Sequence, residues 1–332
     1  MSTFFKKYGL IILFLILFVF TIFLYFLLWQ NSKKKLTFAM LDVGQGDALF
    51  IESPTGTQIL IDGGPSRKIL GQLARLMPPF DRHLDAIIIT NPDRDHIGGF
   101  LEILKNYKVD KIFESGTFNK SKVYKNLKNE IFFQGLTLGS QLNAPQSPKG
   151  LTLEKNPSLN THTTETILAK KGMTLNIGDG AVINILFPDQ DVSSWSTNDG
   201  SIVAQLTYGK NSIMLMGDAT LKTEEIIIKN FQTNADNNNC VFVIVITCKN
   251  NHINILKIGH HGSRTSTSEK LIEKILPNYA FISSGKNNKY NHPHPEILNT
   301  LNKFGTKIFR TDLLGNIIMK SDGENSVFSF EK

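Results

Sequence analysis

The sequence after residue 35 predicts an α+β domain in which two β-sheets pack face to face and helices cover their outer faces. Apolar runs of the length expected for buried strands recur through both halves of the chain. Helical patterns fall between only some of these runs, so the regular strand–helix alternation of a doubly wound parallel sheet is missing. Two sheets that each bury one face against the other fit this pattern best.

The first half of the domain contains apolar runs separated by clear turn residues. Strands flank a Gly44–Asp47 turn, and a helical pattern stops before Pro78 because proline cannot continue a helix. A polar loop is predicted over Asn91–His96, and Gly98 and Gly99 allow a tight turn into the next helix. The predicted strands are 36–43, 48–52, 58–61 and 86–89, and the predicted helices are 67–76 and 100–107.

The second half begins with a loop-rich stretch, 116–170, that is rich in polar residues and proline and has one helical pattern at 123–132. A polar tract at 233–239 predicts a turn. The predicted strands are 173–177, 182–186, 202–208, 212–216, 241–247, 253–258 and 280–284, followed by terminal strands. The predicted helices are 268–275 and one centred on Leu298.

The N-terminus predicts a membrane anchor. Residues 8–29 are apolar and uncharged, and the length of this run exceeds the roughly 20 residues that cross a bilayer as a helix. A cleaved signal peptide is the alternative, but its apolar region is usually about 7–15 residues and ends in a small-residue cleavage site, which this run lacks. We therefore expect an anchor and basic linker at 1–35 and one globular domain at 36–332. Lysines flank both ends of the apolar run, so the positive-inside rule does not decide its orientation. We expect an extracytoplasmic domain because this is the usual orientation of proteins with a signal anchor.

Charge and cysteine content limit the classes of partner and metal site. The net charge is +7, but residues 1–35 carry five lysines and no acid, which leaves 31 basic and 29 acidic residues, or +2, for the rest. Net charge therefore gives no support for a polyanionic partner. Cys240 and Cys248 are the only cysteines, and their pairing stays open. Because no Cys-x-x-Cys pattern exists, a metal site here requires histidine and carboxylate ligands.

Polar residues that bind divalent metals follow the apolar strands at several points. Zinc and manganese take imidazole nitrogens and carboxylate oxygens. Each group alone is more typical of a solvated turn or a surface pair, but one open end of a sandwich would bring them together. These groups are Asp62, residues 91–96, Asp218, His260 with His261, and His292 with His294.

The order of these motifs resembles a known family. The segments LDVGQGDALFI, LIDGG, IITNPDRDHIGG, NDGSIVAQL, IMLMGDA, LKIGHHGS and ISSGKNNKYNHPHPEIL occur in sequence between residue 37 and about residue 320. They are similar to the C-terminal metallo-β-lactamase domain of ComEC-type DNA-uptake proteins and of single-anchor relatives. The resemblance implies an αβ/βα four-layer sandwich with one or two divalent ions, zinc or manganese. The multi-pass channel of the full uptake proteins has no counterpart here.

The resemblance also implies roles for individual residues. The metal-loop signature, His-x-[His/Asp]-x-Asp-His, places its ligand positions at Asn91, Asp93, Asp95 and His96. Asp218 resembles the carboxylate that bridges two metals, and His260 or His261 the late histidine ligand. Asp62 resembles the acid that supports the metal loop. Asp95 is also implied to orient the attacking water, and substrate contacts or proton donation fall to Lys286, His292 and His294.

Two departures from the family pattern bear on the chemistry. The first signature position is Asn91, and an amide oxygen is a poorer zinc ligand than an imidazole, so one of two metal sites should be weakened. An added stretch also lies near 233–251.

The function that the sequence predicts is metal-dependent phosphodiester hydrolysis, acting on DNA at or outside the membrane. Alternatives are hydrolysis of another ester, of the choline-phosphate or lactone type, and a metal-poor binding protein that has lost catalysis. The first alternative is open because a fold does not fix a reaction. The second is open because of Asn91.

Overall fold

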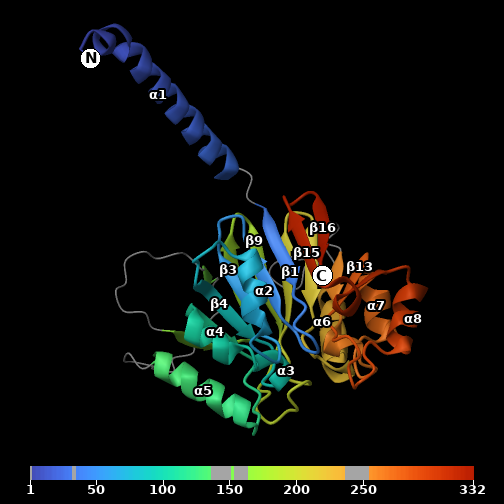
Figure 1. The fold of residues 1–332 in the computed structure, drawn as a ribbon. Helices are drawn as coiled ribbons and strands as arrows, with labels where there is room; N and C mark the ends of the chain where they lie inside the picture. Colours follow the sequence, from blue (N-terminus) through green and yellow to red (C-terminus); the bar gives the residue numbers. More distant parts are fainter. Residues whose placement is uncertain (1, 32–34, 136–150, 153–163, 236–253) are drawn as a thin grey trace. The chain divides into compact units, whose positions relative to one another are not determined.

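The chain, shown here as a computed structural model, is described at residues 2–31, 35–135, 151–152, 164–235 and 254–332 (Figure 1). It divides into two compact units, 1–35 and 36–332. The first unit contains the helix α1, Ser2–Asn31. Its window Tyr8–Tyr25 has a mean hydropathy of 2.7, so this helix is long and apolar enough to cross a membrane.

The second unit contains two sheets of eight strands each. The first sheet has the order β16-β15-β1-β2-β3-β4-β5-β7. Its strands are β1 (Leu36–Met40), β2 (Leu49–Glu52), β3 (Gln58–Ile61), β4 (His83–Ile89), β5 (Lys108–Glu114), β7 (Glu165–Leu168), β15 (Asn316–Ser321) and β16 (Ser326–Glu331). Strands β3, β4, β5 and β7 are parallel, and the other pairs in this sheet are antiparallel.

The second sheet has the order β14-β13-β12-β11-β10-β9-β8-β6. Its strands are β6 (Leu151–Thr152), β8 (Thr174–Gly178), β9 (Ala181–Phe187), β10 (Val203–Tyr208), β11 (Asn211–Leu215), β12 (Ile255–Lys257), β13 (Tyr279–Ile282) and β14 (Lys307–Arg310). Strands β11 to β14 run parallel, with Ile213 opposite Ile255 and Ile255 opposite Tyr279.

The two sheets bury one apolar face against each other. Phe38 of β1 and Phe281 of β13 are fully buried in this layer, with ring centroids 6.1 Å apart. Burial of an aromatic side chain of this size contributes about 1.5–3 kcal/mol to folding. Alternate residues of each strand point to the outer face of the sheet. Helices pack on this outer face and bury these residues.

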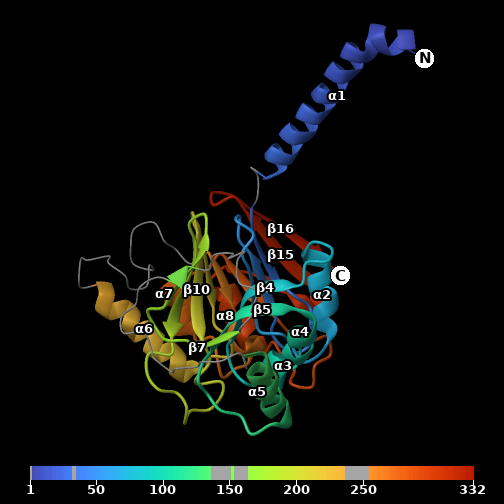
Figure 2. The same ribbon diagram turned by 90° about the vertical axis from the view of Figure 1, so that its left-hand side faces the viewer.

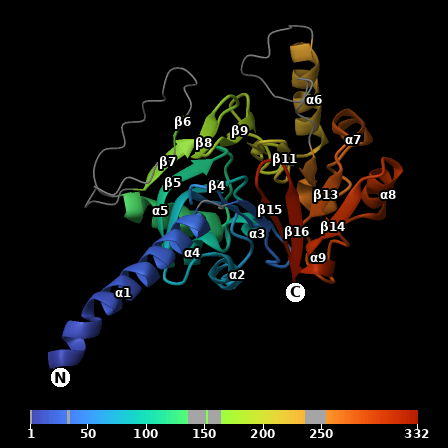
Figure 3. The same ribbon diagram turned by 90° about the horizontal axis from the view of Figure 1, so that it is seen from above.

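Helices cover the outer face of each sheet, so the domain has four layers (Figures 1 and 3). The helices packed on the first sheet are α2 (Lys68–Leu76), α4 (Phe100–Asn106) and α5 (Lys122–Gly135). Those packed on the second sheet are α6 (Leu221–Ala235), α7 (Glu269–Ile275) and α8 (Pro295–Lys303). Two short helices, α3 (Arg94–Ile97) and α9 (Thr311–Leu314), complete the domain. The predicted α+β sandwich is confirmed.

Several elements differ from the sequence predictions. Strand β5 and helix α6 lie where no element was predicted, and β7 falls inside the stretch predicted to be loop-rich. The loop predicted over 91–96 contains the first residues of α3. Gly98 and Gly99 form the predicted turn between α3 and α4, with right-handed φ angles that do not need glycine. Glycine is needed at 99 because a Cβ there would collide with the carbonyl oxygen of Gly63.

The remaining predictions for 236–253 lie outside the described residues. They are the strand 241–247, the end of the 233–239 turn, most of the added stretch near 233–251, and both cysteines, Cys240 and Cys248.

Candidate metal centre

The candidate site forms where the carboxyl ends of parallel strands from both sheets meet. In the first sheet, Asp62 follows β3 and the metal loop follows β4, beside α3 (Figure 2). In the second sheet, Asp218 follows β11 and the histidine pair follows β12. Because parallel strands present their carboxyl ends at one edge, residues far apart in sequence converge here.

Four side chains form a cluster whose ligand atoms lie within 4.8 Å of one another, namely Asp95, His96, Asp218 and His261. The Nε2 atom of His96 is 2.9 Å from Oδ2 of Asp218, which joins the two sheets. The Nε2 atom of His261 lies 3.5 Å from Oδ2 of Asp95 and 3.7 Å from Oδ1 of Asp218. Three of the four residues are buried, and the Asp95 side chain, 35% exposed, forms the open side.

These residues fit a divalent metal ion. His261 Nε2 and Asp218 Oδ1 are both buried, face each other, and have no hydrogen-bond partner among the described residues. Unpaired polar atoms in a protein interior are costly, so two of them at one point call for a third group between them. Two imidazoles and two carboxylates match the donor set that zinc and manganese take.

His96 is held from behind by Asp62. Its Nδ1 atom lies 2.8 Å from Oδ2 of Asp62, whose carboxylate also accepts hydrogen bonds from the amide and hydroxyl of Thr90. A carboxylate on the far nitrogen of a ligand histidine fixes the ring orientation and the tautomer. The supporting role that the resemblance implies for Asp62 is therefore matched by its contacts.

His261 is held by residues that the sequence analysis did not identify. Its Nδ1 atom lies 3.0 Å from the carbonyl of Ser283 and 3.3 Å from Oδ1 of Asp47. Asp47 in turn pairs with Lys257, which is fully buried and also donates to the carbonyl of Gly217, 2.9 Å away. The sequence does contain a sign of this pair. Lys257 lies inside the apolar strand predicted at 253–258, and a buried charge needs a partner of opposite charge.

Burial and charge act in opposition on the pKa values of the cluster. Burial alone lowers the pKa of His96, but Asp218 and Asp62 raise it well above its usual value. Burial also lowers the pKa of His261, but contacts with Asp218 and Asp47 raise it to about 10. For Asp218, burial favours the neutral acid, but the imidazoles hold the pKa well below its usual range. The carboxylates therefore favour the protonated form of both imidazoles, and the imidazoles favour the ionised form of Asp218.

Asn91 and Asp93 lie outside this cluster. The amide oxygen of Asn91 accepts the backbone N–H of Asp93 at 2.9 Å. The carboxylate of Asp93 accepts hydrogen bonds from the Asn119 amide at 2.7 Å and the Thr197 hydroxyl at 2.8 Å. Both residues thus help to order the loop, and the four-residue cluster is made without them.

The two adjacent histidines are separated by the backbone, with positive φ angles of 47° at His260 and 57° at His261. Only His261 joins the four-residue cluster. The Nδ1 atom of His260 lies 2.9 Å from the Thr265 hydroxyl, and its Nε2 atom lies 3.4 Å from the Asn198 amide.

The remaining predicted residues lie on the rim. His292 contacts the cluster directly, since its ring stacks on that of His261 with centroids 6.4 Å apart. Burial and the neighbouring imidazoles lower the pKa of His292 to about 4. His294 packs edge-on against His292, at 4.8 Å, and its Nδ1 accepts the amide of Arg264. Lys286 is exposed on the same loop.

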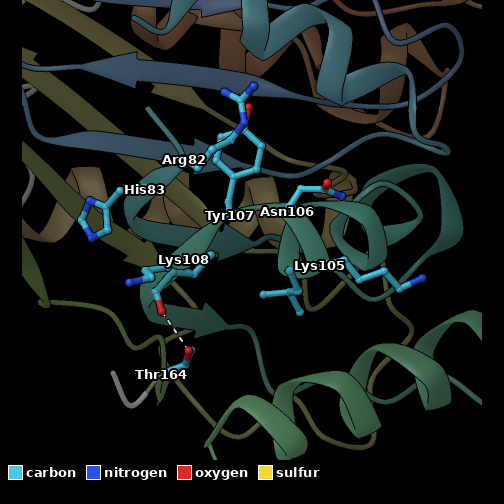
Figure 4. Close-up of a pocket in the computed structure, with 9 residues that line it drawn as sticks. Arg82, His83, Lys105, Asn106, Tyr107, Lys108 and Thr164 are labelled. Carbon is cyan, nitrogen blue, oxygen red and sulfur yellow. Dashed lines mark hydrogen bonds between the residues drawn. The ribbon is translucent and has the colours of Figure 1, made fainter. Parts of the chain in front are cut away.

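A separate cavity of about 660 Å³ lies at the other end of β4 and β5 (Figure 4). Its lining includes Arg82, His83, Tyr107 and Lys108, which stand at the start of these strands. Strand β4 has seven residues, so its two ends are roughly 20 Å apart at 3.3 Å per residue. The cavity is therefore distinct from the metal centre.

Comparisons with known proteins agree with this geometry. Residues 41–128 match the model of the metallo-beta-lactamase superfamily. The chain is 29% identical over 309 residues to ComE operon protein 3 of Bacillus subtilis, covering 87% of this chain and 34% of that protein. It is 28% identical over 308 residues to Recombination protein 2 of Haemophilus influenzae, covering 91% of this chain and 31% of that protein.

The chain spans about a third of the length of these curated relatives. A solved structure, Igni18, a metallo hydrolase of Ignicoccus hospitalis, superposes with a TM-score of 0.46 at 14% identity, covering 89% of this chain and all of that one. The family match indicates a metal-dependent hydrolase, and the fold implies a divalent ion, typically zinc. The family match, the fold and the competence relatives together support a ComEC-like protein of the metallo-β-lactamase fold.

Proposed function

We propose that this protein hydrolyses phosphodiester bonds of DNA with one divalent ion held by Asp95, His96, Asp218 and His261. The convergence of these four side chains is the observation that carries the proposal. An ion bound there supplies a Lewis acid and an acidified water. A single ion is proposed because an amide oxygen such as that of Asn91 is a poor zinc ligand, and Asp93 belongs to none of the groups of potential metal ligands among the described residues.

Exposed cations that are neighbours in sequence of the site residues favour a polyanionic substrate. Each cation is next to a group of the site: one in α3, one beside Asn119, one beside His294, and two on the loop that carries His292. None makes an ion pair within the described ranges, so their charge is free to attract phosphates. These cations are Arg94, Lys120, Arg264, Lys286 and Lys289. The near-neutral domain therefore has exposed positive charges on the segments that carry the site residues.

The rim histidines support charge stabilisation more than proton delivery. The lowered pKa of His292 leaves its ring neutral near pH 7. Because His294 accepts an amide N–H at Nδ1, its neutral ring carries the proton on Nε2. We assign to His294 a hydrogen bond from Nε2 to the phosphate oxygens, where negative charge builds during hydrolysis.

The alternatives are less well supported. A choline headgroup needs aromatic faces that are open to a cation. The exposed ring beside the site is Tyr290, and the exposed cations Lys286 and Lys289 on the same loop would repel a choline cation. A binding protein without metal would have no use for the inward-facing, unpaired atoms of His261 and Asp218.

The same proposal places the domain outside the cytoplasm, tethered by α1, in a process related to DNA uptake. The length and composition of α1 support an anchor. The names of the two relatives, a protein of the ComE operon and a recombination protein, support a role in handling DNA.

The test is a cleavage assay with the full chain in a mild detergent. We expect single-stranded DNA to be cut when Mn²⁺ or Zn²⁺ is added, and Asp218→Asn to abolish cutting. Glu273→Gln, on α7, is the matched control because it removes an exposed carboxylate away from the cluster. A protein that binds metal but leaves DNA intact with either ion would overturn the nuclease proposal.

A further inference from the structure

Three rings form a stacked series from the metal centre to the surface. The ring of His261, a proposed ligand, stacks on His292 with an interplanar angle of 30°. His292 stacks on Tyr290 at 24°, with centroids 5.6 Å apart. Tyr290 is 50% exposed and belongs to none of the three apolar clusters described for the domain. Its ring therefore has no packing role in the core and presents apolar surface to solvent beside the reacting centre.

The loop that carries Tyr290 is fixed in position by one side chain. The Asn288 amide donates to the carbonyls of Gly285 at 2.9 Å and His292 at 2.6 Å. Its oxygen accepts the amides of Tyr290 at 3.2 Å and His292 at 3.0 Å. Gly285 is tied in turn to the neighbouring Gly44–Asp47 turn, through the Gln45 side chain at 3.1 Å. The ring is thus held in place before any ligand binds, which lowers the entropic cost of binding.

Cations accompany this exposed ring. Lys289 lies over Tyr290 and Lys286 is exposed on the same loop, and neither has an ion pair with another described residue. Proteins that bind single-stranded nucleic acids combine these two features, aromatic rings on which bases stack and cations that follow the backbone. A base within a duplex has both faces covered by its neighbours, so a protein ring can stack only on a base that is unpaired.

We propose that Tyr290 is a stacking platform for an unpaired base of the substrate, next to the phosphate at the metal centre. This inference rests on the proposed function and adds to it a subsite for one unpaired base. Lys286 and Lys289 hold the phosphates that flank the stacked base. Asn288 is a positioning residue that keeps the ring parallel to His292.

Binding and cleavage are measured separately on the full chain in detergent. Binding is followed by fluorescence anisotropy with labelled 12-nucleotide DNA, once in EDTA and once with Ca²⁺, using a strand with all bases and strands with one abasic site at each position in turn. We expect one abasic position to weaken binding by about 5- to 150-fold, as expected for loss of one base stacked on an aromatic ring. Tyr290→Ala should weaken binding of the complete strand by a similar factor and leave binding of that abasic strand unchanged.

Matched variants separate stacking from other effects. Tyr290→Phe keeps the ring and should bind like the wild type. Phe80→Ala removes an aromatic ring that is 95% exposed and lies before β4, at the opposite end of this strand from the site, and should change nothing. Phe118→Ala removes the other exposed ring near the metal loop and should affect binding equally for complete and abasic strands.

Each outcome bears on one proposal. Equal weakening of complete and abasic strands by Tyr290→Ala, or no binding of DNA in either condition, overturns the platform. Tyr290-dependent binding without cleavage in Mn²⁺ or Zn²⁺ supports the platform and overturns the nuclease proposal. Cleavage that is equally fast on duplex and single strands, and indifferent to Tyr290, supports the nuclease and overturns the platform.

Discussion

At the scale of single residues, the metal centre depends on how its ligands are supported. His96 is oriented by Asp62, and His261 by Asp47, whose charge Lys257 balances inside the protein. Such supporting groups typically change metal affinity by about 10- to 100-fold. Stability and metal binding should therefore be coupled at this end of the domain.

The Lys257→Met variant tests this coupling. It leaves Asp47 as a buried carboxylate without its partner, which should lower the free energy of unfolding by about 3–5 kcal/mol. Urea denaturation measures the change. The double variant Lys257→Met/Asp47→Asn removes both charges and should recover much of the loss. The exposed Lys320→Met control, on β15, should stay within about 0.5 kcal/mol of the wild type. An equally stable Lys257→Met protein would contradict the buried pair.

Metal binding should release protons. The imidazole of His261 must lose its proton to become a ligand, and carboxylate contacts raise its pKa to about 10 in the metal-free protein. At pH 7 the proton is present and the ion must displace it, so affinity should rise as pH rises. Titration calorimetry in two buffers of different ionisation enthalpy measures the number released. Identical heats in both buffers would show that no proton leaves.

The sequence predicted most of these residues but not their arrangement. Asp95, His96 and Asp218 follow strands in a recognisable order, and each lies in the cluster. Sequence could not choose between His260 and His261, because both are the same residue type and the backbone angles at the pair decide which ring turns inward. Asp47 was not predicted, because an aspartate in a glycine-rich turn has no distinguishing local pattern.

At the scale of elements, the site depends on close approach of backbone segments. The Gly44–Asp47 turn contacts the metal loop, since the amide of Asp47 donates to the carbonyl of Asp95 at 3.2 Å. Gly46 lies at the same contact with a φ of 143°, and a Cβ there would collide with the Asp95 carbonyl oxygen. Glycine is therefore required at position 46 by both conformation and space.

Substitution of Gly46 by alanine should displace Asp95 and weaken metal binding by at least about tenfold, as for other losses of ligand support. Gly71→Ala is the matched control, because this glycine lies in α2 and nothing is within 4 Å of its added Cβ. Alanine there should stabilise the helix by about 1 kcal/mol without changing metal affinity. Metal titration followed by thermal unfolding checks both variants. Unchanged affinity in Gly46→Ala would argue against this contact.

Elements with a clear apolar period were predictable, and those governed by tertiary contacts were not. Strand β3 was predicted at its observed bounds because Gln58 and the three apolar residues after it lie between turn signals. Strand β5 begins with Lys-Val-Asp-Lys, which gives no strand pattern, and pairing with β4 and β7 fixes it. The loop-rich prediction around β7 failed for the same reason, since its side chains are largely exposed.

At the scale of the whole molecule, the charges that flank the membrane anchor are distinct from those that could contact DNA. The lysines at 1–35 flank an apolar helix, and the domain that follows is close to neutral overall. Some of its exposed cations are next in sequence to residues of the proposed site. DNA binding should therefore depend on these local groups and on salt, more than on net charge.

Removal of residues 1–35 should move the protein from the membrane to the soluble fraction. The remaining unit, 36–332, has its own core between the sheets. Fractionation of cells that express either form checks this prediction, with the metal content of both proteins as the control for folding. Retention of the shortened protein on membranes would argue against α1 as the anchor.

The central claim, one ion held by four converging side chains, is tested most directly by diffraction from crystals of the metal-loaded protein, with data collected on both sides of the metal absorption edge. The account predicts one anomalous peak, bound by Asp95, His96, Asp218 and His261, and elemental analysis that gives about one ion per chain. A peak held instead by Asn91 and Asp93, or no bound metal after growth in metal-replete medium, would contradict it.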